Sequence, residues 1–104
     1  MAKKSNKSSY ETSFFNDVIK ASVADFIEMF GEPDDNNNTG EDKVNYEWTC
    51  ETSDGHVFTI YDWKEYRPIS QSEIIGWHIG GESSKVTRKA LNEIAMMILI
   101  KHQK

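Results

Sequence analysis

The clearest periodic pattern in the first half of the chain predicts a short amphipathic helix. Four apolar side chains at spacing i, i+3, i+4 and i+7 share one helical face: Val23, Phe26, Ile27 and Phe30. Ser22 stands before them as an N-cap, and Asp25 three residues later completes a capping box. Because Gly31 and Pro33 disfavour a continued helix, we expect it to end at Gly31.

An alternating pattern predicts a β-hairpin in the middle of the chain. In 44–51 every second residue is apolar or aromatic, so one face of the strand holds Val44, Tyr46, Trp48 and Cys50. Asp54 and Gly55 mark the turn, and 56–63 forms the returning strand.

The register of this hairpin decides which rings are exposed. A two-residue loop would put Tyr61 and Trp63 on the same face as Trp48. A three-residue loop, with Gly55 in the left-handed conformation, instead leaves Tyr61 and Trp63 on the outer face. We favour this second register because it also leaves both glutamates of the first strand outside. Its cross-strand pairs are Trp48 with Ile60 and Cys50 with Phe58.

The remaining segments complete an α+β domain. Residues 13–21 are consistent with a short strand or packed arm, 74–79 with a third strand, and 85–101 with a final helix capped by Ser83 or Ser84. We therefore predict a small antiparallel sheet of three to four strands with an N-terminal and a C-terminal helix. Residues 1–12 are polar and are expected to be a disordered tail, which leaves 13–104 as a single domain.

The final helix has more apolar residues than one sheet face can cover. Its core stripe is Val86, Ala90, Ile94, Met97 and Ile98. Met96, Leu99 and Ile100 add apolar side chains on other sides of the helix. This excess predicts a homo-oligomer, a dimer or tetramer, that associates through the C-terminal helix.

Composition narrows the classes of function. A formal net charge of −5 argues against binding of duplex nucleic acid, which needs a surplus of Lys and Arg. The longest apolar run, 94–100, is far shorter than the roughly 20 residues of a membrane-spanning helix, and no signal peptide is evident. Cys50 is the only cysteine and no Cys/His set has zinc spacing, so we expect a cytoplasmic protein without metal or cofactor.

Residues 59–68 and 76–81 concentrate the chemistry of ligand recognition. The rings that can stack on a planar ligand are Tyr61, Trp63, Tyr66 and Trp77. The cations that can neutralise a phosphate are Lys64, Arg67, Lys85 and Arg88. The groups that can donate hydrogen bonds to it are His78, Gly80, Gly81 and Ser83. Together they favour a planar, anionic small molecule such as a nucleotide.

Plainer interpretations exist for several of these residues. Trp77 lies between two isoleucines on one strand face, which is typical of a core residue. The Gly80-Gly81 pair is equally well explained as a strand-to-helix turn. His78 has only Asp62 as a nearby acid, so a catalytic His–Asp pair for phosphodiester hydrolysis is the weaker hypothesis. The acidic loop 34–42 is typical of a solvated surface loop more than of a nucleic-acid mimic.

Five short motifs resemble small proteins common in tailed-phage genomes. They are Phe30-Gly31-Glu32-Pro33, Glu47-Trp48, Asp54-Gly55, Thr59-Ile60-Tyr61-Asp62-Trp63-Lys64 and Trp77-His78-Ile79-Gly80-Gly81. The resemblance extends over about residues 13 to 95. In its apolar C-terminal helix and its segment of aromatic and cationic residues, the chain is also similar to phage nucleotide sponges, which sequester the cyclic nucleotide signals of bacterial defence systems.

The resemblance implies a non-hydrolytic, oligomeric binder of a cyclic di- or oligonucleotide, acting in the cytoplasm of an infected bacterium. It implies a pocket shared between subunits and no catalytic residues. The alternative function is a protein-binding inhibitor of a host factor that uses the same aromatic residues as interface anchors.

Overall fold

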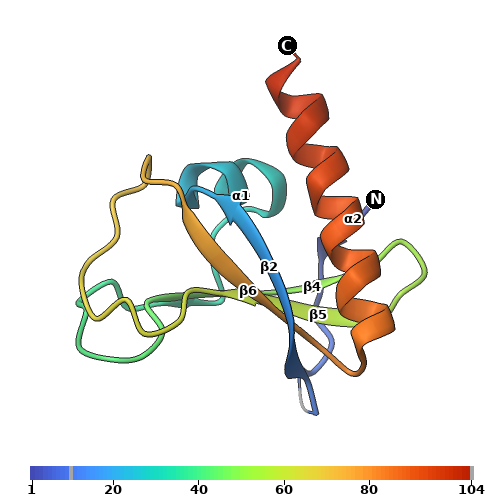
Figure 1. Ribbon diagram of the computed structural model, residues 1–104, viewed down its shortest axis with the longest axis horizontal. Helices are drawn as coiled ribbons and strands as arrows, with labels where there is room; N and C mark the ends of the chain where they lie inside the picture. Colours follow the sequence, from blue (N-terminus) through green and yellow to red (C-terminus); the bar gives the residue numbers. More distant parts are fainter. Residues whose placement is uncertain (10, 104) are drawn as a thin grey trace.

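The computed structural model describes residues 1–9 and 11–103. The elements follow in the order β1 (Lys3–Lys4), β2 (Ser13–Ala21), α1 (Val23–Phe30), β3 (Asp35–Asn36), β4 (Tyr46–Glu51), β5 (Val57–Tyr61), β6 (Ile75–Gly81) and α2 (Ser84–His102). The strands form one antiparallel sheet in the order β1-β4-β5-β6-β2, with β3 beside β1 on the same edge of β4 (Figure 1). The α+β class is confirmed, and the six-stranded sheet is larger than the three to four strands expected.

The predicted start and end of α1 are confirmed. Ser22 is the N-cap and forms a reciprocal capping box with Asp25. Gly31 ends the helix with φ of +82°, a conformation that favours glycine. Ahead of the helix, β2 spans the residues expected to form a strand or arm. A β-bulge interrupts β2, where Asn16 has φ of +72° and the register shifts between Phe14 and Val18.

The β4–β5 hairpin adopts the favoured register. Trp48 pairs with Ile60 and Cys50 with Phe58, and Gly55 has φ of +88° in the turn. Tyr61 consequently lies opposite Glu47 on the outer face of the sheet.

The expectation for the Gly80-Gly81 pair as a turn is wrong. Both glycines lie inside β6: Gly80 is opposite Thr59 and Phe14, and Gly81 is opposite Phe58 and Ser13. The chain leaves the sheet only after Gly81, and Ser83 then caps α2 by accepting a hydrogen bond from the Val86 N–H.

The expected disordered tail is also wrong over the described part of 1–12. Lys3 and Lys4 pair with Glu51 and Cys50 at the edge of the sheet, and the Ser5 N–H donates to the Thr49 carbonyl. Ala2 is buried in the core. Tyr10, within that range, and Lys104, at the end of the expected domain, lie outside the described residues.

Both helices contribute to a core on the inner face of the sheet. Phe26 of α1 packs against Trp48 and Trp77, with ring centroids 5.3 Å apart in both pairs. Ala90 and Ile94 of α2 join the same buried cluster. α2 continues past the strands toward the C-terminus (Figure 1). No described helix is long and apolar enough to cross a lipid bilayer.

The outer face of the sheet is organised in two cross-strand rows. One row runs Glu47, Tyr61, His78 and Val18 across β4, β5, β6 and β2. The next row runs Thr49, Thr59, Gly80 and Phe14. Because the helices pack on the other face, these rows position the candidate site.

Candidate functional site

Four aromatic side chains gather on the outer face, and we call them the outer-face cluster: Phe14, Tyr61, Trp63 and His78. Phe14 stacks on His78 with ring centroids 3.9 Å apart and planes 11° apart. Trp63 lies nearly parallel to His78 at 6.2 Å, and Tyr61 meets His78 edge-on at 5.5 Å. Phe14 and Trp63 remain 38% and 40% exposed. The cluster therefore presents partly exposed aromatic rings to solvent.

The sheet register brings these rings together from distant parts of the sequence. Tyr61 and His78 are direct cross-strand partners, and Phe14 lies opposite Gly80, two residues beyond His78. A Cβ at Gly80 would lie 2.6 Å from Thr59 Oγ1, so a larger residue there would force Thr59 to shift. Gly80 and Thr59 are themselves buried, and the Tyr61 ring lies 3.5 Å from the position of that Cβ.

Two lysines flank the Trp63 ring. The Nζ atoms of Lys43 and Lys64 lie 5.8 Å and 5.6 Å from its centroid, within the range of cation–π attraction. The Lys64 N–H donates to the Lys43 carbonyl at 2.8 Å, which holds the two residues side by side. Across the described residues, neither lysine has a carboxylate within ion-pair distance. One end of the cluster thus carries positive charge that no carboxylate neutralises.

The remainder of the cluster is uncharged near neutral pH. Burial lowers the pKa of His78 below its ordinary value of 6.5, which favours the neutral imidazole. Burial, with a smaller contribution from the charge of Glu47, raises the pKa of Tyr61 above 10. The cluster can therefore bind a ligand by ring stacking and by hydrogen bonds from neutral groups, and Lys43 and Lys64 add positive charge beside Trp63.

The structure brings some of the predicted site residues together. Tyr61, Trp63 and His78 form three of the four cluster rings, Lys64 flanks Trp63, and Gly80 lies on the same face. Tyr66 is 53% exposed, but no ring contact joins it to the cluster among the described residues.

Trp77 lies on the opposite side of the sheet. It is fully buried, and its indole N–H donates to the Ala21 carbonyl at 2.9 Å. Its ring packs against Phe26 and Trp48. No face of this ring is left for a ligand, so Trp77 belongs to the core.

The two arginines of the predicted set already have carboxylate partners. Arg67 binds Glu73 through both terminal nitrogens and Glu65 at 3.1 Å. Arg88 donates to the buried carboxylate of Asp17 at 3.1 Å and so joins α2 to β2. An anionic ligand would have to displace these carboxylates, so neither arginine is a free phosphate-binding cation.

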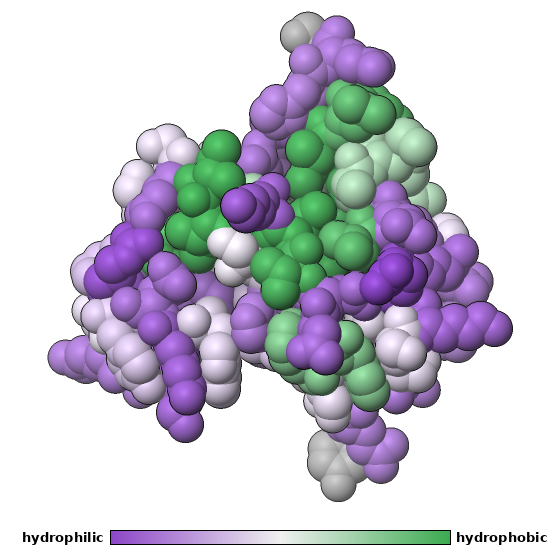
Figure 2. Space-filling view, in the orientation of Figure 1, coloured by the Kyte–Doolittle hydropathy of each residue, from purple (hydrophilic) through white to green (hydrophobic). Residues whose placement is uncertain are grey.

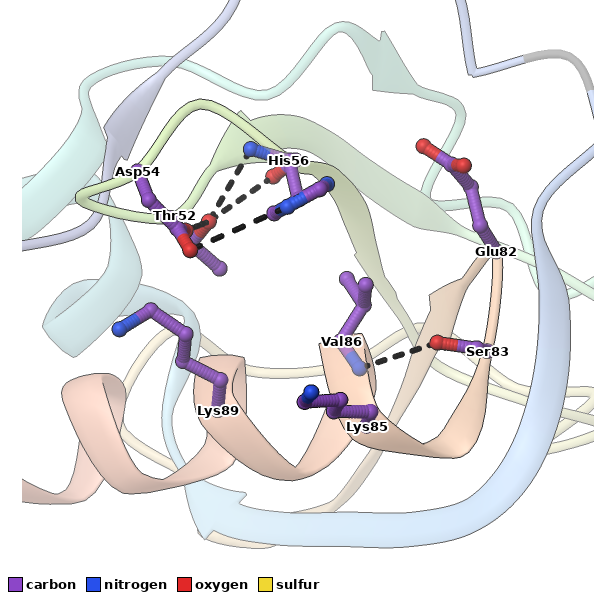
Figure 3. A pocket seen from close by; sticks show the side chains of 8 residues that line it. All are labelled: Thr52, Asp54, His56, Glu82, Ser83, Lys85, Val86 and Lys89. Carbon is purple, nitrogen blue, oxygen red and sulfur yellow. Dashed lines mark hydrogen bonds and ion pairs between the residues drawn. The ribbon is translucent and has the colours of Figure 1, made fainter.

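Ser83 and Lys85 line a separate cavity of about 430 Å³ between the β4–β5 turn and the start of α2 (Figure 3). Thr52, Asp54 and His56 form its turn side, while Glu82, Val86 and Lys89 lie on or beside the helix. The Ser83 hydroxyl is used as the helix cap. Gly81 takes no part in either site; a Cβ there would lie 2.9 Å from Thr87 Cγ2, so this glycine allows α2 to pack closely.

Asp62 is a structural acceptor. It is fully buried, and one carboxylate oxygen accepts the N–H groups of Asn45 and Tyr46 at 2.8 Å and 2.9 Å. The other accepts the Asn45 amide at 3.0 Å. Asp62 points to the face opposite Tyr61 and Trp63, so it does not form the hypothetical catalytic pair with His78.

Sequence reasoning missed Phe14, Lys43 and Glu47 as members or neighbours of the site. The Phe14-Phe15 pair did hold a signal, because adjacent residues of a strand point to opposite faces and both cannot enter one core. Lys43 lies 21 residues before Lys64 in the sequence and is brought to it only by backbone pairing. No local pattern marks it.

A comparison with protein-family models, curated proteins and solved structures gives no significant match. Among residues 1–9 and 11–103, no group of three or more His, Cys, Asp and Glu side chains is arranged to hold a metal ion. The proposal below therefore rests on the site itself and on the motif resemblance.

Proposed function

We propose that the protein binds a nucleotide on the outer-face cluster and holds it without converting it. The observation behind this proposal is the exposed Trp63 ring with two lysines near it that, within residues 1–9 and 11–103, have no carboxylate at ion-pair distance. A base stacked on an aromatic side chain contributes about 1–3 kcal/mol, and the lysines provide charge for a phosphate beside it.

The phage resemblance extends this proposal to a cyclic di- or oligonucleotide, sequestered in the cytoplasm of an infected bacterium. Two features support binding over hydrolysis. The buried Asp62 carboxylate is occupied by three N–H groups, and His78 is stacked against Phe14 instead of facing an acid. The cluster then acts as a platform and not as an acid–base pair.

Titration calorimetry with cyclic di-GMP, cyclic di-AMP, GMP and AMP tests the proposal. We expect Trp63→Ala to abolish measurable binding and Lys43→Gln or Lys64→Gln each to weaken it by about 1–3 kcal/mol, the range for charged hydrogen bonds. Lys85→Gln is the matched control, because this lysine is also exposed and makes no ion pair with the described part of the chain, but lines the other cavity.

The state of the ligand separates a binder from an enzyme. Bound nucleotide should return chemically intact after heat denaturation, as seen by chromatography. Converted nucleotide, with conversion lost in His78→Ala, would overturn the proposal. Equal binding by the wild type, Trp63→Ala and the lysine variants would move the site away from the cluster.

A protein partner on the same surface is the second candidate function. Val18 is 43% exposed on β2, in the same cross-strand row as Tyr61 and His78, and it extends the aromatic surface with an apolar side chain. A host protein would be anchored by such residues. Failure to bind any of the four nucleotides, with capture of one defined host protein that Trp63→Ala abolishes, would favour this candidate.

We also infer that the chain forms a homo-oligomer through the C-terminal half of α2. Met96, Leu99 and Ile100 are 49%, 54% and 45% exposed. Figure 2 shows apolar surface gathered along this part of α2 and continuing toward α1. Burial of such a patch by a second copy would remove it from water.

Light scattering tests the oligomer. We expect an oligomeric wild type and a monomeric Leu99→Glu variant. Ser84→Glu is the control, because it adds the same charge at the exposed first turn of α2, where an acid is favourable. A monomeric wild type at micromolar concentration would contradict the inference.

A further inference from the structure

The outer-face cluster is electrically polar. Lys43 and Lys64 lie at Trp63, whereas Glu47 lies on β4 directly opposite Tyr61. Cross-strand partners have Cβ atoms about 4.5–5.5 Å apart, so the Glu47 carboxylate borders the aromatic surface on the side away from β6. A ligand on the cluster would find cations beside Trp63 and a carboxylate beside Tyr61.

The Glu47 carboxylate has no cationic partner in the part of the chain that the structure describes. Its carboxylate makes no hydrogen bond or ion pair with the described residues, while its neighbour Asp34 accepts both the Lys4 ammonium and the Thr49 N–H. Glu51, on the same strand face, binds Ser5 and lies near Lys3 and Lys7. Glu47 is thus the acid on this face of β4 that is left without a donor.

The surroundings of Glu47 mean that a hydrogen-bond donor supplied by a ligand would stabilise its ionised carboxylate. Burial first, and then the charges of Asp35 and Asp34, raise the pKa of Glu47 above 4.5. The same factors mean that the ionised carboxylate is poorly solvated here. N–H groups placed against it would relieve that cost.

We propose that Glu47 selects guanine among the bases, by accepting the N1–H and 2-amino groups of a guanine stacked on the cluster. This inference rests on the proposed nucleotide-binding function. Guanine presents two adjacent N–H donors on one edge, which match the two oxygens of a carboxylate. The phosphate of the same nucleotide lies toward Lys43 and Lys64.

The other bases fit this end less well. Adenine and cytosine each place an unprotonated ring nitrogen beside the amino group, and its lone pair would face the carboxylate. Uracil has one N–H between two carbonyl oxygens. A site built to hydrogen-bond a donor pair discriminates against ligands that lack it, because the protein group is then left unpaired.

Calorimetric titration with GMP, IMP and AMP tests the selection. IMP keeps the N1–H of GMP and lacks the 2-amino group, so it isolates the second hydrogen bond. We expect the wild type to bind GMP at least about tenfold more tightly than AMP, with IMP between them. In Glu47→Gln this preference should fall to within about twofold or invert, because an amide can both donate to and accept from adenine.

Glu51→Gln is the matched control, because it removes a charge from the same strand face at a carboxylate that already has partners. It should keep the preference for GMP. Equal affinity of the wild type for GMP and AMP, both lost in Trp63→Ala, would overturn the guanine selection and leave nucleotide binding in place. Absence of binding to all three mononucleotides would overturn the guanine selection, and absence of binding to the two cyclic dinucleotides as well would overturn the proposed function.

Discussion

The sheet has an aromatic cluster on each face, and the two are opposite in character. On the inner face, Trp48 and Trp77 are fully buried, their ring centroids are 5.7 Å apart, and each indole N–H donates to a backbone carbonyl at 2.9 Å. On the outer face, Trp63 is 40% exposed, and its indole N–H has no hydrogen-bond partner among the described residues. The same residue type thus completes a core on one side and stays available on the other.

The difference shows which property marks a recognition residue. A buried tryptophan whose N–H is satisfied contributes area to folding and leaves nothing to a ligand. Trp63 keeps an exposed ring, two adjacent lysines and an indole N–H that has no acceptor among the described residues. The type of ring does not distinguish a core tryptophan from a recognition tryptophan. The strand face on which it lies and the hydrogen-bond partner of its indole N–H do distinguish them.

The largest change in stability is expected when one tryptophan is removed from each face in turn. Trp77→Ala should destabilise the protein by about 3–5 kcal/mol, because it leaves a large cavity and an unpaired Ala21 carbonyl. Trp63→Ala should change stability by about 1 kcal/mol or less, as for exposed sites. Urea unfolding measures both. Similar losses in the two variants would mean that the outer cluster is a second core.

The second test concerns Asp62, which lies between two outer-face aromatics in sequence yet points inward. Asp62→Ala should cost about 2–4 kcal/mol, since each buried N–H left unsatisfied costs about 1–3 kcal/mol. Asp42→Ala, at an exposed acid with a single amide contact, is the control and should be nearly neutral. A fully stable Asp62→Ala variant would remove the structural role assigned to this carboxylate.

Several parts of the fold were predictable because local signals determine them. The Ser22–Asp25 capping box and Gly31 define α1, and the left-handed Gly55 defines the hairpin register. β1 and β3 were not predictable, because two-residue strands of polar residues have no periodicity and form only through pairing with β4. Gly80 and Gly81 lie within a strand where Thr59 and Thr87 approach them closely, and these contacts arise only when the strands pair and α2 packs.

The candidate site was predictable to the extent that register governs it. Placing Tyr61 and Trp63 on the outer face followed from the hairpin alone. The cations were harder, because their partners decide their role. Glu65 and Glu73 lie close enough in sequence to indicate that Arg67 is neutralised, but Asp17 lies 71 residues from Arg88 and is reached only through the packing of α2 on β2.

A smaller effect on stability is expected when a side chain is added at Gly80, on the sheet face that carries the outer-face cluster. Gly80→Ala would place a Cβ 2.6 Å from Thr59 Oγ1, and forced repacking of this kind costs about 1–3 kcal/mol. Gly76→Ala, on the same strand face, meets Val18 Cγ1 at 3.0 Å and should cost less. Nucleotide affinity should fall in Gly80→Ala more than in Gly76→Ala. The reverse order would show that the ligand lies away from the Thr59–Phe14 row.

The smallest expected effect is the pH dependence that the outer cluster gives to folding. Burial holds the pKa of His78 below 6.5 in the folded protein, so the unfolded chain binds this proton more readily. Stability from His78 is therefore present above pH 6.5 and is lost as the pH falls below it. In His78→Gln, the decline in the free energy of unfolding between pH 7.5 and pH 5 should be shallower than in the wild type.

NMR titration of the imidazole supplies an independent measurement. A His78 pKa above 6.5, with a wild type that gains stability on acidification, would mean that the imidazolium is stabilised by Glu47 across Tyr61, and the cluster would then be a charged site instead of a neutral stacking platform.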